Sequence, residues 1–245
     1  MKIIISPAKK MSDKQDVFES EGKPMFLKEA NKLRQYLKNL GWQELKEILQ
    51  CSDDLVDLNY KRYQEDNPQR ITALTSYVGL QYQHMAPHLF SIEEWKYCKE
   101  YLWILSGMYG VVRPQDEIAF YRLEMQAIVK GFKEENLYQF WESAITKLVE
   151  QEDVIINLAS KEYSDVLQDK QKVVDIVFAQ EVKGQLQVKG TQAKMARGAM
   201  VRYMAENNVT KVESLKKFNA MGFVYRDELS SSKRLVFIWH KEICN

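Results

Sequence analysis

Polar and charged side chains follow three runs of β-branched and apolar residues that are typical of buried strands. They are Ser6, Lys9 and Lys10 after the first run, Ser106, Tyr109 and Arg113 after the second, and Ser160 and Glu162 after the third. In open α/β sheets, ligand sites form outside the carboxyl ends of the strands. The pattern therefore predicts a polar cleft at one edge of a sheet. The alternative is a set of ordinary loops, which are polar because they are solvated.

A basic stretch without Asp or Glu covers residues 189–202. Its pattern predicts a helix on which Lys194 and Arg197 share a face and Arg202 lies on the flank. The free backbone N–H groups at the start of this helix, near Thr191, favour an anion. Phosphate, in a nucleic-acid backbone or in a nucleotide, is the partner that this arrangement favours. A solvated basic face is the alternative.

Arg122 and Glu124 carry opposite charges at positions i and i+2. In a strand, this spacing places both side chains on the same face of the sheet. Together with Tyr121, a fixed pair of this kind orients a ligand group. A buried structural ion pair explains the same pattern equally well.

The histidines do not indicate a metal site or a catalytic dyad. His84 and His88 have a spacing that suits metal binding on a helix, but Pro87 lies between them and disrupts such a helix. No histidine falls in the polar clusters, and no glycine-rich phosphate loop is present. We therefore predict neither a metal ion nor another cofactor.

The bulk composition limits the kind of partner that the protein can have. The chain has 245 residues and a net charge of +1, so contact with nucleic acid requires local clustering of cations. Cys51, Cys98 and Cys244 are scattered and are expected to be reduced thiols of a cytoplasmic protein. The apolar runs are too short for a secretory leader or a membrane span.

Periodicity and turn residues predict a single α/β (mixed α+β) domain over residues 1–245. Strands are expected at residues 3–5, 101–105, 153–158, 173–182, 222–225 and 235–239. Helices are expected over residues 24–65 with an interruption at Gly41, over 135–149, and over 191–206 with Thr191 as the N-cap. The expected domain has a mixed central β-sheet, flanking helices and a helical insertion, about residues 24–95, after the first strand.

Five sequence blocks in a fixed order resemble the YaaA family of bacterial peroxide stress proteins. The blocks are Ile5-Ser-Pro-Ala-Lys-Lys-Met11, Leu105-Ser-Gly-Met-Tyr-Gly-Val-Val-Arg-Pro114, Tyr121-Arg-Leu-Glu-Met125, Asn157-Leu-Ala-Ser-Lys-Glu-Tyr163 and Ala193-Lys-Met-Ala-Arg-Gly198. Similarity continues through Gly222-Phe-Val-Tyr225 and residues 230–234. The resemblance therefore extends from the first predicted strand to the last.

The resemblance implies a cytoplasmic protein of the response to hydrogen peroxide that limits damage from intracellular iron. It also implies a mixed α/β fold with a basic cleft, and DNA binding through that cleft and a helix-hairpin-helix element. The matching segments are residues 42–50 and 53–63. Their connecting turn lacks glycine, and residues 42–66 hold three basic and seven acidic residues, which opposes approach to a polyanion.

Two functional hypotheses follow. In the first, the protein binds DNA with weak sequence preference through Lys9, Lys10, Lys194, Arg197, Arg202, Lys233 and Arg234. In the second, it is an enzyme or ligand-binding protein that holds a small anionic, nucleotide-like molecule in the polar cleft. The cations of the second hypothesis are Lys9, Arg113, Arg122, Lys194 and Arg197, with Glu124, Glu162 or Tyr109 as proton-transfer groups and Ser6, Ser106 and Ser160 as further polar groups.

Overall fold

A mixed β-sheet forms the centre of the protein. The computed structural model describes residues 1–14 and 17–240, so Cys244 lies outside the described residues. The strands of the sheet are β1 (Lys2–Ile5), β5 (Leu102–Ser106), β6 (Gly110–Val112), β8 (Ile155–Leu158), β9 (Val173–Val182), β10 (Gln185–Gln187), β11 (Phe223–Tyr225) and β12 (Arg234–Trp239). Their order is β11-β12-β9-β8-β1-β5-β6, and β10 pairs with β9. The six predicted strands and the mixed α/β fold are confirmed.

The inner strands are parallel, and the edges are antiparallel. β12, β9, β8, β1 and β5 pair in parallel, whereas β6 and β11 run antiparallel to their neighbours. Ile3, Ile4 and Ile5 of β1 lie between β5 and β8 with no exposed surface. A strand that is covered on both faces carries a continuous apolar run, which is why this segment does not alternate with polar residues.

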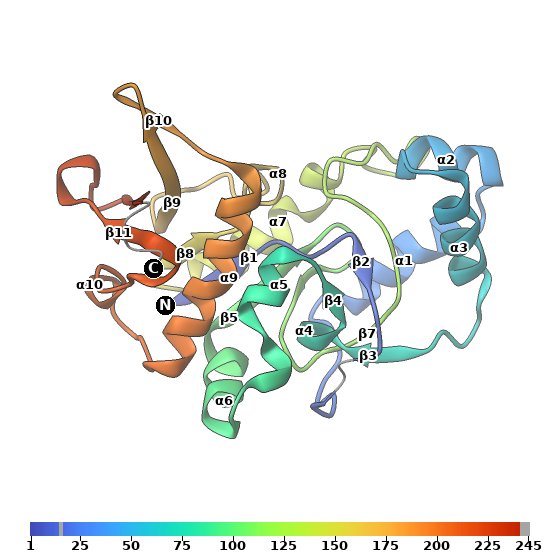
Figure 1. Ribbon diagram of the computed structural model, residues 1–245. Helices are drawn as coiled ribbons and strands as arrows, with labels where there is room; N and C mark the ends of the chain where they lie inside the picture. Colours follow the sequence, from blue (N-terminus) through green and yellow to red (C-terminus); the bar gives the residue numbers. More distant parts are fainter. Residues whose placement is uncertain (15–16, 241–245) are drawn as a thin grey trace.

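Helices cover both faces of the sheet (Figure 1). In the view shown, α5 (Leu80–Met85), α6 (Ile92–Tyr101) and α9 (Gly190–Glu206) lie in front of it, and α7 (Leu137–Glu150) lies behind it. The short helices α8 (Lys161–Ser164) and α10 (Val212–Leu215) follow β8 and α9. The predicted N-cap of α9, Thr191, is wrong, because the helix begins one residue earlier and Lys189 occupies the cap position without a side-chain bond.

The segment between β1 and β5 contains more than the expected helices. Residues 24–65 form α1 (Leu27–Lys38), α2 (Trp42–Leu49) and α3 (Asp53–Gln64), with the predicted break at Gly41. The helices predicted for residues 24–65 are therefore confirmed. Short elements that the pattern did not predict are β2 (Lys10–Met11), β3 (Arg70–Thr72), α4 (Ala73–Ser76), β4 (Tyr77–Val78) and the 3-10 turn η1 (Pro87–Leu89). Two or three residues are too few to establish a strand period.

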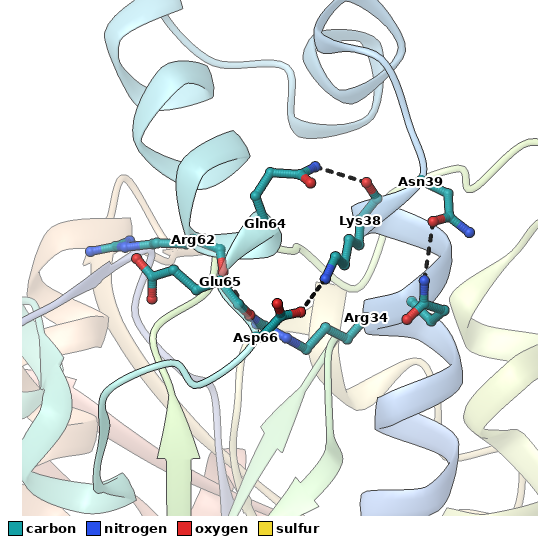
Figure 2. A network of polar contacts seen from close by, with 8 residues as sticks. Arg34, Lys38, Asn39, Arg62, Gln64, Glu65 and Asp66 are labelled. Atoms are coloured by element: carbon teal, nitrogen blue, oxygen red, sulfur yellow. Dashed lines mark hydrogen bonds and ion pairs between the residues drawn. The ribbon is translucent and has the colours of Figure 1, made fainter.

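Polar contacts fix α1 against the end of α3 (Figure 2). The Arg34 guanidinium donates to the backbone carbonyl of Arg62 at 2.6 Å, and the Gln64 side-chain amide donates to the Lys38 carbonyl at 2.8 Å. These bonds satisfy carbonyls that the ends of the helices leave without an internal partner. The α2–α3 hairpin is thereby held in place relative to α1.

Two short strand pairs lie outside the main sheet. β3 pairs with β7 (Glu117–Ala119), and β2 pairs with β4. The 3-10 helices η2 (Ala220–Gly222) and η3 (Asp227–Leu229) flank β11.

The tightest helix contact joins α9 to α5. A Cβ atom built on Gly198 would lie 1.9 Å from the backbone oxygen of Gln81. Arg202 of α9 donates to the carbonyls of Met85 and Ala86, at 2.9 and 3.2 Å, where α5 ends. The two helix backbones therefore touch directly at Gly198, and this contact sets the position of α9.

We predict that Gly198→Ala lowers the free energy of unfolding by at least about 2 kcal/mol, because a methyl group at this contact forces the helices apart. Thermal unfolding is expected to move down by roughly 5 °C for a chain of this length. Gly190→Ala is the matched control in the same helix, since nothing lies within 4 Å of a Cβ at that position. Equal stability of the two variants would contradict the close contact.

Candidate anion-binding site

A cavity of about 290 Å³ lies where β8 ends, beside β9 and α9. We call it the basic cavity, because four of its lining side chains are cations. Its lining consists of Asn157, Ala159, Lys161, Ser164, Asp165, Lys170, Asp175, Ile176, Val177, Arg197 and Arg234. Asn157, Asp175 and Arg234 share one face of the sheet, since Asn157 pairs with Asp175 and Arg234 also pairs with Asp175.

Arg197 is the least compensated charge of the basic cavity. Its guanidinium has no hydrogen bond or ion pair among the described residues, and its Nε atom is buried. Burial alone lowers the pKa of Arg197, with no carboxylate opposing the effect. A buried cation without a counter-charge is unfavourable unless a ligand supplies the missing charge.

The carboxylates of the basic cavity are already occupied. Asp165 lies 3.7 Å from the ammonium of Lys170, and Asp175 accepts a bond from the Asn157 amide at 2.7 Å. Lys161 and Arg234 are exposed, and no described residue pairs with either side chain. Three cations therefore remain available for an oxyanion in a space large enough for a phosphate group.

A second group of charged residues lies at the end of β1, and we call it the polar cluster: Ser6, Lys9, Arg122, Glu124, Ser160 and Glu162. Glu124 accepts from the Lys9 ammonium at 2.7 Å and from the Arg122 guanidinium at 3.0 Å. The hydroxyl of Ser6 accepts from the backbone N–H of Ser160 at 2.8 Å and lies 3.1 Å from the Ser160 hydroxyl.

Glu162 belongs to the polar cluster because Glu124 and Lys9 lie close enough to change the pKa of its carboxyl group. Burial raises the pKa of Glu162, and the neighbouring Glu124 raises it further. Lys9 and the backbone N–H groups of Met125 and Gln126 oppose this rise. The net effect is a raised pKa, so the Glu162 carboxyl group keeps its proton to a higher pH than it would in water.

The structure differs from the sequence prediction at these two sites in two respects. Arg122 and Glu124 do pair, but the strand expected for them is wrong, because residues 120–124 have no regular structure. The pair forms across an irregular segment instead. Lys161 was missed as a site residue, although it stands inside one of the recognised blocks, directly after Ser160.

Ser106 and Tyr109 lie in the interior and not at either site. Ser106 has no exposed surface and its hydroxyl bonds to the Tyr121 hydroxyl at 2.7 Å. The Tyr109 hydroxyl accepts from the backbone N–H of Ala119 at 3.1 Å. Burial raises the pKa values of both tyrosines, so their hydroxyls remain protonated and support the packing of the core.

The other predicted cations are dispersed. Arg113 binds the buried Asp116, with its Nη2 atom 2.7 Å from the carboxylate. Arg202 pairs with Glu206 at 2.9 Å, and Lys233 donates to the carbonyl of Gln171. Two have no partner among the described residues: Lys194 is exposed one turn before Arg197, and Lys10 lines a separate cavity of about 320 Å³. The structure thus brings Arg197 and Arg234 together, but it does not unite all the predicted cations in one cleft.

The comparisons with known proteins agree across nearly the whole chain. The family model described as peroxide stress protein YaaA matches residues 1–229. A UPF0246 protein of Lachnoclostridium phytofermentans is 43% identical over 245 residues, covering 97% of this chain and 96% of the relative. UPF0246 proteins of Pediococcus pentosaceus and Desulfitobacterium hafniense are 43% and 42% identical, each covering 97% of this chain and 98% of the relative.

The chain belongs to the peroxide stress protein YaaA family. The predicted resemblance is confirmed, and membership supports a role in the response to oxidative stress. Within residues 1–14 and 17–240, no group of three or more His, Cys, Asp or Glu side chains is arranged for a metal ion. No helix in the described part of the chain is long and apolar enough to cross a membrane.

We predict that Arg197→Met makes this YaaA-family protein more stable. The substitution fills a similar volume and removes a buried donor group that lacks a partner, which is worth roughly 1–3 kcal/mol. The measurement is the free energy of unfolding in urea, with Lys147→Met on the exposed surface of α7 as control. A large loss of stability in Arg197→Met would show that Arg197 has a structural partner, and would contradict our interpretation of the cavity.

Proposed function

We propose that the protein is a cytoplasmic protein of the peroxide stress response that binds the phosphate backbone of DNA at the basic cavity. The observation that supports this function is a set of three cations around one cavity, Lys161, Arg197 and Arg234, none of which pairs with a residue that the structure describes. Lys194 of α9 is exposed, has no partner in the described part of the chain, and adds a further cation one turn before Arg197. Such cations neutralise phosphates and release counterions, which gives weak sequence preference and strong salt dependence.

The DNA contact that we propose does not use the α2–α3 hairpin. Asp53, Asp54 and Asp57 give this hairpin negative charge, and Lys46, one of its three cations, already pairs with Asp53 at 2.6 Å. Like charge opposes the approach of a phosphate backbone. The basic cavity carries the opposite charge, and it is therefore the better site for a polyanion.

We further propose that the protein helps to limit damage from intracellular iron through this contact with DNA, and not by holding iron itself. Peroxide damages DNA when it reacts with iron close to the DNA. A protein that binds the phosphate backbone competes with the cations bound there, and this includes iron ions. The family membership supports the stress-response part of this proposal.

The alternative function is binding of a small anionic ligand. The polar cluster supports this function separately, because two of its buried polar atoms have no partner in the part of the chain that the structure describes. The two functions use different residues and can be tested independently.

We predict that Arg197→Ala/Arg234→Ala weakens binding to duplex DNA and lowers the slope of log K against log salt by about 1–2, because up to two phosphate contacts are lost. The measurement is fluorescence anisotropy of a labelled duplex across a salt series. The matched control is Lys133→Ala/Lys147→Ala, which removes two exposed charges outside the basic cavity.

The control variant is expected to keep the wild-type slope. If both double variants lose affinity equally, the contact depends on overall charge and the cavity has no special role. If the wild type does not bind duplex at physiological salt, the DNA function is wrong for this protein.

A further inference from the structure

Two buried polar atoms in the polar cluster have no hydrogen-bond partner within residues 1–14 and 17–240. They are the Nε atom of Arg122, a hydrogen-bond donor, and the Oε1 atom of Glu162, which accepts when ionised and can donate when protonated. Unsatisfied buried groups of this kind are uncommon in native proteins, and each has a cost of about 1–3 kcal/mol. Two of them in the same cluster call for a common explanation.

The unpaired atoms are held in place by their surroundings. Arg122 is fixed by its 3.0 Å bond to Glu124 and by its own carbonyl, which accepts from the Tyr63 hydroxyl at 2.9 Å. The side chains of Arg122 and Glu124 are only 13% and 15% exposed. Glu162 is held at the start of α8, where the hydroxyl of Tyr138 donates to its carbonyl at 2.8 Å. The Arg122 side chain is therefore preorganised, and the backbone that carries Glu162 is held in place.

One side of the cluster is open to solvent. The Lys9 side chain is 61% exposed although its ammonium binds Glu124. Cys51, in the turn between α2 and α3, is partly exposed and lies close enough for Arg122, Glu124 and Lys9 to influence its pKa. The solvent-facing side of the polar cluster is therefore the side of Lys9, and the α2–α3 turn with Cys51 lies close to it.

We propose that Arg122, Lys9 and Glu162 form a binding site for the oxyanion group of a small molecule, such as a carboxylate, sulfate or phosphate group. The oxygen atoms of the ligand accept from Arg122 Nε and from Lys9, and Glu162 donates to the ligand in its protonated form. This arrangement satisfies both unpaired atoms with one ligand group. The proposal rests on the small-ligand alternative and not on DNA binding.

Binding at this site is expected to weaken as the pH rises. Of the groups that face Glu162, Glu124 disfavours its ionised form and Lys9 favours it. The charge of Glu162 in turn raises the pKa values of Tyr163 and Tyr138. Burial raises the pKa of Glu162 above its ordinary value. Below that pKa the carboxyl group is neutral and donates to the ligand. Above it, the carboxylate repels an oxyanion.

The test is a sulfate titration followed by NMR at the side-chain Nε–H signal of Arg122, against chloride at equal ionic strength. Sulfate keeps its charge between about pH 5 and about pH 8, so any pH dependence belongs to the protein. We expect a saturable shift of the Arg122 signal whose affinity falls about tenfold over this range, which corresponds to about one pKa unit of linkage.

Three variants decide between interpretations. Arg122→Lys lacks the Nε donor and is expected to lose sulfate binding. Glu162→Gln mimics the protonated carboxyl group and is expected to bind sulfate with nearly equal affinity at both pH values. Arg197→Ala is expected to bind sulfate at the polar cluster like the wild type, which separates this site from the basic cavity.

Failure of the Arg122 signal to respond to sulfate would overturn the proposal, whatever the result for DNA. A pH dependence that persists in Glu162→Gln would likewise exclude the role given to Glu162. Thermal unfolding of each variant confirms that it folds before the titration is interpreted.

Discussion

The contact between α9 and α5 is the constraint on which both sites depend. Gly198 brings the backbone of α9 directly onto the backbone of α5, and Arg202 binds the last carbonyls of α5. Because the helices cannot move closer or slide without a clash, Arg197 has a fixed position beside the sheet. α5 also contacts the second site, because the Tyr82 hydroxyl donates to the carbonyl of Ser6 at 2.9 Å and so fixes the end of β1.

The one-turn helix α8 connects the two sites. Lys161 lines the basic cavity, whereas Glu162 belongs to the polar cluster. Successive helical residues point roughly 100° apart, so two neighbours in sequence can serve two separate sites. Both sites contain buried atoms that have no hydrogen-bond partner among the described residues, Nε of Arg197 in one and Nε of Arg122 with Oε1 of Glu162 in the other. Such groups lower stability, and a ligand that satisfies them offsets this cost.

Much of the fold could be predicted from the sequence, because the long elements have clear periods. The apolar run at Ile3–Ile5 and the helix with Lys194 and Arg197 are examples. The short strands β2, β3 and β4 were missed, since their pairing depends on distant partners and not on local pattern. The position of Thr191 was also misjudged, because the helix begins at a glycine without a side-chain cap.

The site residues could be predicted by type but not by grouping. Arg197 and Arg234 are 37 positions apart in the sequence, and they meet only because β12 pairs with β9 next to the end of β8. Arg113 and Arg202 have the same chemistry, but nearby carboxylates already bind them. Whether a cation is free or paired depends on tertiary contacts, and one sequence does not contain this information in local form.

The most direct test of the central claim is lysine acetylation of the protein with and without duplex DNA, measured at each lysine by mass spectrometry. Lys161, Lys194 and Lys61 are all exposed. Lys161 lines the basic cavity and Lys194 lies on α9 one turn before Arg197, whereas Lys61 lies on α3 of the hairpin. We predict that DNA protects Lys161 and Lys194 and leaves Lys61 reactive. Protection of Lys61 with Lys161 and Lys194 unprotected would contradict binding at the basic cavity and would place the DNA on the hairpin.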